Sequence, residues 1–129
     1  MPSIFTKIVQ GEVPCYKVAE NERFLAFLDI YPVAKGHTLV IPKQEIDYYF
    51  DLEDDLIAEM NIFAKKVAIA LKKYTNCKRI CTAVIGYEVP HAHLHLIPTN
   101  SMADVQFSKK LKFSPEEFKE IAQDIQKFL

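Results

Sequence analysis

The sequence contains little of several residue types that would narrow the protein's class. Its 129 residues include three cysteines, three glycines and no tryptophan. Cys15, Cys77 and Cys81 form no C-x-x-C pair, so the spacing that marks many zinc and redox sites is missing. An odd number of unpaired cysteines suits a reducing cytosol, where they serve as small apolar side chains.

Strong charge and long apolar runs are also missing. The formal net charge is −1 and no segment reads as a basic arm, so binding to a nucleic acid polymer is not indicated. The first residues, Met1–Lys7, lack the charged leader, apolar run and cleavage site of a secretion signal. No apolar run reaches the roughly 18 residues that could span a bilayer. We expect a cytoplasmic protein without a membrane partner.

The remaining composition is that of an ordinary soluble globular protein, with 50% hydrophobic and 26% charged residues. A chain of 129 residues is long enough to bury a core, but it is too short for two domains of the usual size. We therefore expect one domain that spans residues 1–129.

Three of the four histidines lie in one short segment. There they alternate with small or apolar residues, in the order Pro90-His91-Ala92-His93-Leu94-His95-Leu96-Ile97-Pro98. In a strand, alternate side chains lie on opposite faces, so the three imidazoles would share one face at a spacing of roughly 6 to 7 Å. Burying three adjacent titratable rings merely to fill space would cost desolvation energy. The pattern therefore favours chemistry on phosphate, or metal binding.

Hydrophobic periodicity, turn residues and capping signals predict the elements around this segment. Leu56, Met60, Val67 and Leu71 recur three or four residues apart and favour a long helix, and Ser114-Pro115-Glu116-Glu117 is typical of a helix start. The predicted elements are helices over 3–10, 51–74 and from 115 onward, and strands over 15–19, 24–29, 37–41, 79–85 and 92–97. We predict an α+β fold with a five-stranded, mainly antiparallel sheet and one long and two shorter helices.

Four blocks of the sequence resemble the histidine triad (HIT) superfamily of nucleotide hydrolases and transferases. His91-Ala92-His93-Leu94-His95-Leu96-Ile97 is similar to the family's alternating histidine signature. Ile4-Phe5-Thr6-Lys7-Ile8-Val9, followed by Glu12-Val13-Pro14, resembles its opening helix. Phe27-Leu28-Asp29-Ile30 and His37-Thr38-Leu39-Val40-Ile41-Pro42-Lys43 resemble its nucleoside-binding strands. The blocks occur in the family's order.

The resemblance implies a HIT-like homodimer in which the two sheets join into one, with a nucleoside pocket in each subunit and no cofactor or metal. By position, His93 would be the nucleophile, and His95 would contact the phosphate and assist the leaving group. His37 and His91 would support them, and Asp29 would accept hydrogen bonds from the ribose hydroxyls. The apolar walls around base and ribose would be Ile4, Phe5, Ile8, Phe27, Ile30 and Leu39.

Imidazole chemistry is consistent with these roles. A neutral ring can attack phosphorus to give a nucleotidyl-histidine intermediate that water then hydrolyses. A hydrogen bond from the other ring nitrogen to a backbone carbonyl would fix the required tautomer. Because neighbouring histidines repel each other's charge, we expect one to stay neutral as the nucleophile while another is protonated and faces the phosphate.

One position departs from the family pattern. Three residues before the first histidine, many members have a small hydroxyl residue or similar donor that helps to hold the phosphate or leaving group, whereas this chain has Glu88. A carboxylate there would repel a phosphate oxyanion unless it is protonated or turned away. Glu88 would then face solvent, or bind a cationic leaving group such as an amine. The glycine-rich loop before the triad is also short.

We therefore predict a nucleotide hydrolase that cleaves a purine nucleoside phosphoramidate, or a similar nucleoside monophosphate conjugate, with a small nucleotide as its partner. Dinucleoside polyphosphate hydrolysis and nucleotidyl transfer use the same chemistry. Two alternatives belong to other classes. One is a noncatalytic nucleotide-binding sensor. The other is a metal-binding protein, since two strand histidines and a third ligand can hold zinc with one position open.

Overall fold

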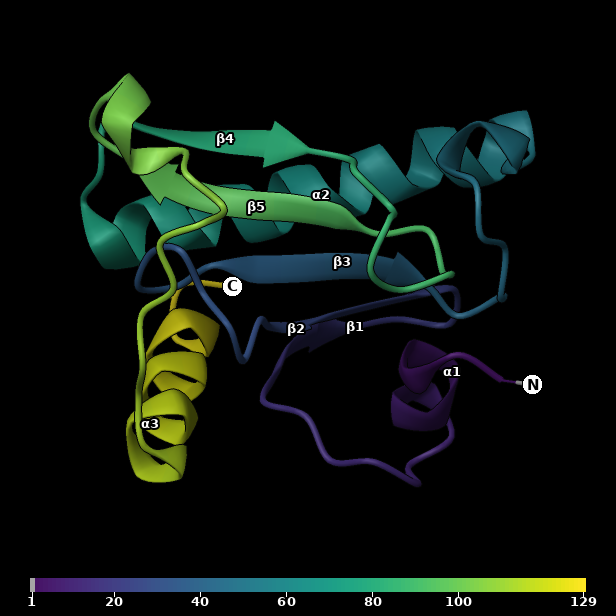
Figure 1. Ribbon diagram of the computed structural model, residues 1–129, viewed down its shortest axis with the longest axis horizontal. Helices are drawn as coiled ribbons and strands as arrows, with labels where there is room; N and C mark the ends of the chain where they lie inside the picture. The colour runs from purple at the N-terminus through teal and green to yellow at the C-terminus, as the bar shows by residue number, and fades with distance from the viewer. Residues whose placement is uncertain (1) are drawn as a thin grey trace.

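The architecture is an antiparallel sheet with two helices on one face and a short helix on the other. A computed structural model describes residues 2–129 (Figure 1). Its elements in chain order are α1 (Ile4–Val9), β1 (Lys17–Glu20), β2 (Phe24–Leu28), β3 (Thr38–Pro42), η1 (Tyr49–Asp51), α2 (Asp54–Thr75), β4 (Arg79–Ala83), β5 (Leu94–Thr99), η2 (Met102–Asp104) and α3 (Pro115–Gln126). The strand order is β1-β2-β3-β5-β4, and every neighbouring pair is antiparallel. The predicted α+β class is confirmed, with a wholly antiparallel sheet.

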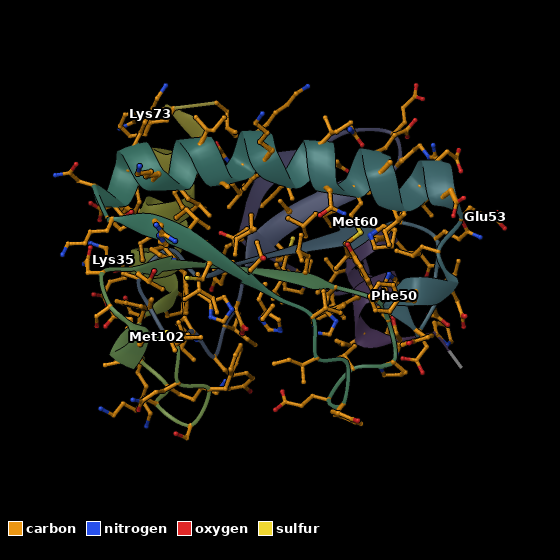
Figure 2. The ribbon with its side chains drawn as sticks, turned by 90° about the horizontal axis from the view of Figure 1, so that it is seen from above. Lys35, Phe50, Glu53, Met60, Lys73 and Met102 are labelled. Carbon is orange, nitrogen blue, oxygen red and sulfur yellow. The ribbon has the colours of Figure 1, made fainter. Side chains whose placement is uncertain are left out.

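The long helix α2 packs on one face of the sheet and encloses the main core. Acidic Asp54 and Asp55 lie in its first turn and Lys72 and Lys73 in its last, which complements the helix dipole. Asn76, with a φ of 55°, ends it in the left-handed conformation. Its buried face packs against β2, β3, β4 and β5. Figure 2 shows the helix lying along one face of the sheet. The residues of that face are Leu56, Met60, Ala64, Val67, Ala70 and Leu71.

The C-terminal helix α3 begins at the predicted capping box. The Ser114 hydroxyl accepts the Glu117 N–H at 3.1 Å, and the Glu117 carboxylate accepts the Ser114 N–H at 2.8 Å. Phe118, Ile121 and Ile125 are buried, and the helix lies beside α2 on the same face of the sheet. The helix closes the core over β1 and β2.

The two faces of the sheet have different side chains, because residues alternate along each strand. Ala92, Leu94 and Leu96 lie in the main core with α2 and α3. On the opposite face, α1 packs through Phe5 on a second cluster that also contains Leu25, Phe27, Leu39 and Ile41. The predicted division between apolar residues and histidines is therefore present, and the histidines lie on the face away from α2.

The boundary of the histidine strand was predicted too early. β5 begins at Leu94, so only His95 lies within it, while His91 and His93 lie in the preceding connection. The alternation of faces continues through that connection, and the Ala92 N–H donates a hydrogen bond to the Ile46 carbonyl at 2.7 Å.

None of the helices among residues 2–129 is both long and apolar enough to cross a membrane.

Candidate active site

A cavity of about 690 Å³ opens on the face of the sheet away from α2. In Figure 2 the η2 segment with Met102 and the β4–β5 connection both project on this side. The cavity contains every residue predicted to form the apolar walls, namely Ile4, Phe5, Ile8, Phe27, Ile30 and Leu39. Asp29, Glu88, His93 and His95 also line it. His37 and His91 lie behind this lining and are 1% and 0% exposed.

Backbone and hydroxyl partners fix the tautomers of His91 and His93. His91 Nε2 lies 2.8 Å from the Pro42 carbonyl oxygen, which can only accept, so this nitrogen carries the proton. His91 Nδ1 therefore accepts a hydrogen bond from the Ser3 hydroxyl at 2.8 Å. His93 Nδ1 donates to the His91 carbonyl oxygen at 2.6 Å. The lone pair of His93 is consequently on Nε2.

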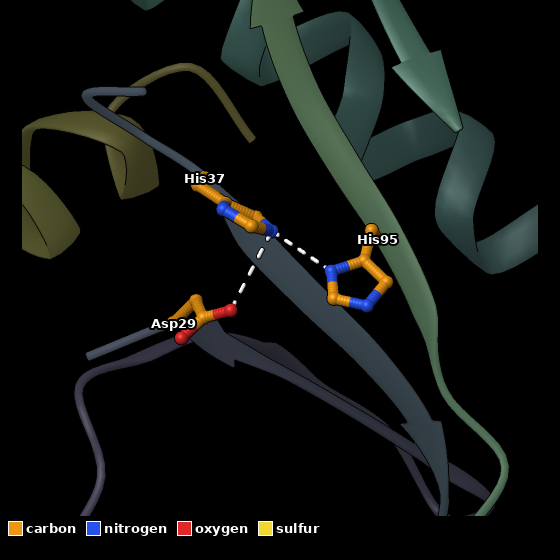
Figure 3. Close-up of side chains that lie close together, drawn as sticks. All are labelled: Asp29, His37 and His95. Atoms are coloured by element: carbon orange, nitrogen blue, oxygen red, sulfur yellow. Dashed lines mark hydrogen bonds and ion pairs between the residues drawn. The ribbon is translucent and has the colours of Figure 1, made fainter. Parts of the chain in front are cut away.

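The second histidine pair has the reverse arrangement. The Val33 N–H can only donate, and it lies 3.1 Å from His37 Nδ1, so the proton of neutral His37 is on Nε2. That N–H donates to His95 Nδ1 at 2.9 Å (Figure 3). His95 therefore carries its own proton on Nε2.

The two front histidines thus present opposite groups. The Nε2 atoms of His93 and His95 make no hydrogen bond within residues 2–129. No buried side-chain nitrogen or oxygen in this part of the chain lacks a partner, so these two atoms are not buried and are open to the cavity. The centres of the two rings lie 5.1 Å apart. A proton acceptor and a proton donor therefore lie side by side, close enough for both to contact one phosphoryl group.

Burial keeps three of the histidines neutral. Loss of solvation lowers the pKa of His37 and of His91, with Asp29 opposing the effect at His37 and the Pro42 hydrogen bond opposing it at His91. Loss of solvation also lowers the pKa of His95, and repulsion from His37 and His93 adds to this. The expectation of one protonated histidine facing the phosphate concerns the substrate complex, and it stays a prediction.

Asp29 follows β2 and borders both the cavity and His37. Its Oδ1 accepts the Tyr31 N–H at 2.8 Å, and its Oδ2 lies 3.6 Å from His37 Nε2 (Figure 3). The side chain is 15% exposed, so part of the carboxylate remains available to a ligand.

The geometry of Asp29, His37 and His95 fits a hydrogen bond between the two imidazoles better than it fits a metal ion. Asp29, His37 and His95 each offer a ligand atom, and these atoms lie within 4.8 Å of one another. However, two imidazole nitrogens on one tetrahedral zinc ion are separated by about 3.4 Å. The 2.9 Å between His37 Nε2 and His95 Nδ1 instead matches an N–H···N hydrogen bond.

Glu88 lies at the rim of the cavity and its side chain is exposed. None of the hydrogen bonds and ion pairs found among residues 2–129 uses its carboxylate. Its neighbour Tyr87 is 94% exposed. The carboxylate is therefore free to turn toward solvent, as one of our two interpretations expects.

Ser3, Phe107 and Lys110 contact the histidines or line the cavity, and the sequence did not predict them as site residues. Ser3 caps α1, where its hydroxyl accepts the Thr6 N–H, and the same hydroxyl donates to His91 Nδ1. Phe107 and Lys110 line the cavity from the segment between η2 and α3. That segment has no periodic pattern or motif, so the sequence carried no signal for them.

Comparisons with known proteins agree with this geometry. The HIT domain family matches residues 10–102. An uncharacterized HIT-like protein of Helicobacter pylori is 44% identical over 98 residues, which cover 74% of this chain and 94% of that protein. The adenosine 5'-monophosphoramidase of Schizosaccharomyces pombe is 39% identical over 129 residues, covering 97% of this chain and 96% of that protein.

A solved structure extends the likeness to the fold. A Hit-like protein of Bartonella henselae, described as involved in cell-cycle regulation, superposes with a TM-score of 0.86 at 30% identity, covering 98% of this chain and 96% of that one. The alternating histidines, the five-stranded sheet and the family match all point the same way: this chain belongs to the HIT domain family.

Proposed function

We propose that the protein hydrolyses a purine nucleoside phosphoramidate, or a similar nucleoside monophosphate conjugate, through a nucleotidyl-histidine intermediate. The observation that carries this proposal is the opposite protonation of two neighbouring ring nitrogens, a bare Nε2 on His93 and an Nε2–H on His95. The name of the S. pombe relative supports the choice of a phosphoramidate. Dinucleoside polyphosphate hydrolysis and nucleotidyl transfer require the same first step.

In the first step, His93 Nε2 attacks phosphorus and the bond to the leaving nitrogen breaks. The ring then carries a positive charge, which the His91 carbonyl stabilises through the Nδ1–H at 2.6 Å. The bound phosphate is an anion beside His95, so it raises the pKa of that ring and a proton is taken up with the substrate. His95 passes this proton to the departing amine and becomes neutral again.

In the second step, water attacks the phosphorus and the bond to His93 Nε2 breaks. His95 accepts the proton of the attacking water, as a general base, and releases it to solvent when the product leaves, which balances the proton taken up with the substrate. The overall change is the addition of one water, giving a nucleoside monophosphate and an amine. Asp29 and the apolar walls would hold the ribose and the base during both steps, with Phe5 already in edge contact with the His93 ring at 5.1 Å.

The test is release of AMP from adenosine 5′-phosphoramidate in excess chelator, with native protein beside His93→Ala. Turnover that survives the chelator and disappears in the variant supports the histidine mechanism. A metalloenzyme would instead lose activity to the chelator. A noncatalytic sensor would bind AMP and give the same background rate for both proteins. Rapid quenching of native protein during turnover should also reveal a mass increase of one nucleotidyl group.

We also propose that two copies associate and continue the sheet across the interface. β4 is an edge of the sheet, so one side of Arg79–Ala83 carries backbone groups without a strand neighbour in the described chain. The outer face of α2 adds the exposed apolar residues Ile62 and Ile69, at 59% and 48%. The mass in solution, from sedimentation, decides between a monomer and a dimer.

A further inference from the structure

The cavity contains little positive charge for a site that would bind an anion. Its charged lining residues are the carboxylates Asp29 and Glu88 and a single amine, Lys110. The front histidine His95 is neutral in the free protein, since burial lowers its pKa. A phosphate that entered this cavity would therefore meet two negative groups and one positive group.

Lys110 belongs to a connector, residues 105–114, that joins η2 to α3 and passes the ends of β5 and β3 (Figure 1). A hydrogen bond from the Leu111 N–H to the Pro32 carbonyl, at 2.7 Å, attaches the connector to the loop between β2 and β3. The Phe107 ring packs in a T-shaped arrangement on His95 and on His37, with ring centres 5.1 Å and 6.4 Å apart. The connector thus covers the His37–His95 pair.

The Lys110 ammonium lies over the same Phe107 ring, 5.7 Å from its centre. The side chain is exposed, and none of the ion pairs among residues 2–129 uses it. Its charge is close enough to His37 and His95 to disfavour their protonation. Lys110 is therefore a cation without a carboxylate partner, held beside the donor histidine by an aromatic ring.

We propose that Lys110 is the phosphate-binding cation of this site, and that the connector supplies it. Lys110 lies outside residues 10–102, the part of the chain that matches the HIT domain family. The inference rests on the proposed function, since it assumes that the cavity takes a nucleoside monophosphate group. It adds the source of the positive charge that neutral histidines do not provide.

The experiment compares binding of AMP and of adenosine, which differ by the phosphate alone. Equilibrium titrations use native protein, Lys110→Met, Lys110→Arg and Lys109→Met. Lys109 is the matched control, because it is an exposed lysine on the same connector that does not line the cavity. We expect Lys110→Met to weaken AMP binding about tenfold, with adenosine binding unchanged. Lys110→Arg and Lys109→Met should stay within about twofold of native protein.

Two results would overturn the inference. In one, Lys110→Met binds AMP as tightly as native protein does. In the other, it loses AMP and adenosine affinity equally, which would indicate a general change in the cavity. Because the readout is binding, it is separate from the chemical step. If Lys110→Met selectively loses AMP affinity while native protein shows no turnover, the proposed hydrolysis is contradicted and the assignment of Lys110 is still supported.

Discussion

The two histidine pairs of the site are built alike and end in opposite states. In each pair a fully buried ring stands behind one that faces the cavity, His91 behind His93 and His37 behind His95. In the first pair the front ring donates its Nδ1–H to a carbonyl, and in the second it accepts at Nδ1 from an N–H. One front ring is left with a lone pair and the other with a proton.

The difference arises from backbone groups that cannot change their role. A carbonyl oxygen must accept and an amide N–H must donate, so the His91 carbonyl and the Val33 N–H dictate which nitrogen is protonated. The side chains only transmit that choice. Identical residues thereby acquire the two functions that general acid–base chemistry needs, a proton acceptor and a proton donor.

The largest effect on turnover should come from replacing each of the two cavity-facing histidines in turn. We expect His93→Ala to lower turnover by roughly 10³-fold or more, because it removes the nucleophile. We expect His95→Ala to lower it by roughly 10²-fold to 10⁴-fold, because it removes the acid. A 4-nitrophenyl ester of AMP, whose leaving group needs no proton, should restore much of the rate to His95→Ala and none to His93→Ala. Equal rescue of both variants would contradict the division of roles.

The next effect concerns stability in acid. The pKa values of His37, His91 and His95 lie below the unfolded value of about 6.5, so below that pH the unfolded chain binds protons that the folded chain refuses. Stability is therefore present above pH 6.5 and is lost as the pH falls toward the lowered values. Each ring contributes up to about 1.4 kcal/mol per pH unit in this window.

Urea unfolding between pH 7 and pH 5 measures this slope. The variant His95→Gln should show a smaller slope than native protein, because one buried histidine is gone. Glu20, with its pKa lowered to about 2 by Lys17 and Lys43, changes its protonation below this window and does not disturb the comparison. A free energy of unfolding that stays constant from pH 7 to pH 5 would show that the rings are not held neutral.

A smaller effect separates helix capping from support of the first pair. Ser3 and Ser114 both cap helices, but only Ser3 also donates to His91. Ser114→Ala should cost about 1 kcal/mol of stability and leave turnover unchanged. Ser3→Ala should cost about 2 kcal/mol and lower kcat several-fold, since His91 Nδ1 then loses its donor. Similar kcat values for the two variants would argue against a role for the Ser3 hydroxyl behind the nucleophile.

The smallest effect is expected at Glu88. Because its carboxylate is exposed and free to turn away, Glu88→Ser should change kcat/KM for the phosphoramidate by no more than about threefold. For a substrate whose leaving group carries a cation, such as a phosphoramidate of a diamine, a loss larger than tenfold would instead favour the second interpretation, in which Glu88 binds an amine. Glu22→Ser, on an exposed turn away from the cavity, is the control.

Local signals in the sequence were sufficient for the helices and for the face that the histidines share. The periodicity of α2 and the capping box at Ser114 depend on neighbours three or four residues apart, so they are legible without the fold. The partners of His91 and His37 are different, since Pro42 lies 49 residues from His91, and His95 lies 58 residues from His37. Neither the tautomers nor the neutral state follow from spacing.

The connector was the least predictable part of the site. Phe107 and Lys110 belong to a segment without regular structure, and only the hydrogen bond of Leu111 to Pro32 and the packing of Phe107 place them at the cavity. Such contacts depend on tertiary structure alone. The predicted roles of Asp29 and of the apolar walls stay predictions, although all of these residues line one cavity.

The alternation along 91–97 means that the same short segment builds the core on one side and the site on the other. A residue inserted between His93 and His95 would turn either the upstream histidines toward α2 or Leu94 and Leu96 into the cavity. Substitutions can therefore change the chemistry of this segment one position at a time, but the insertion or deletion of a single residue would disrupt either the core or the site. The fold therefore constrains the spacing of the histidines as strictly as it constrains the core.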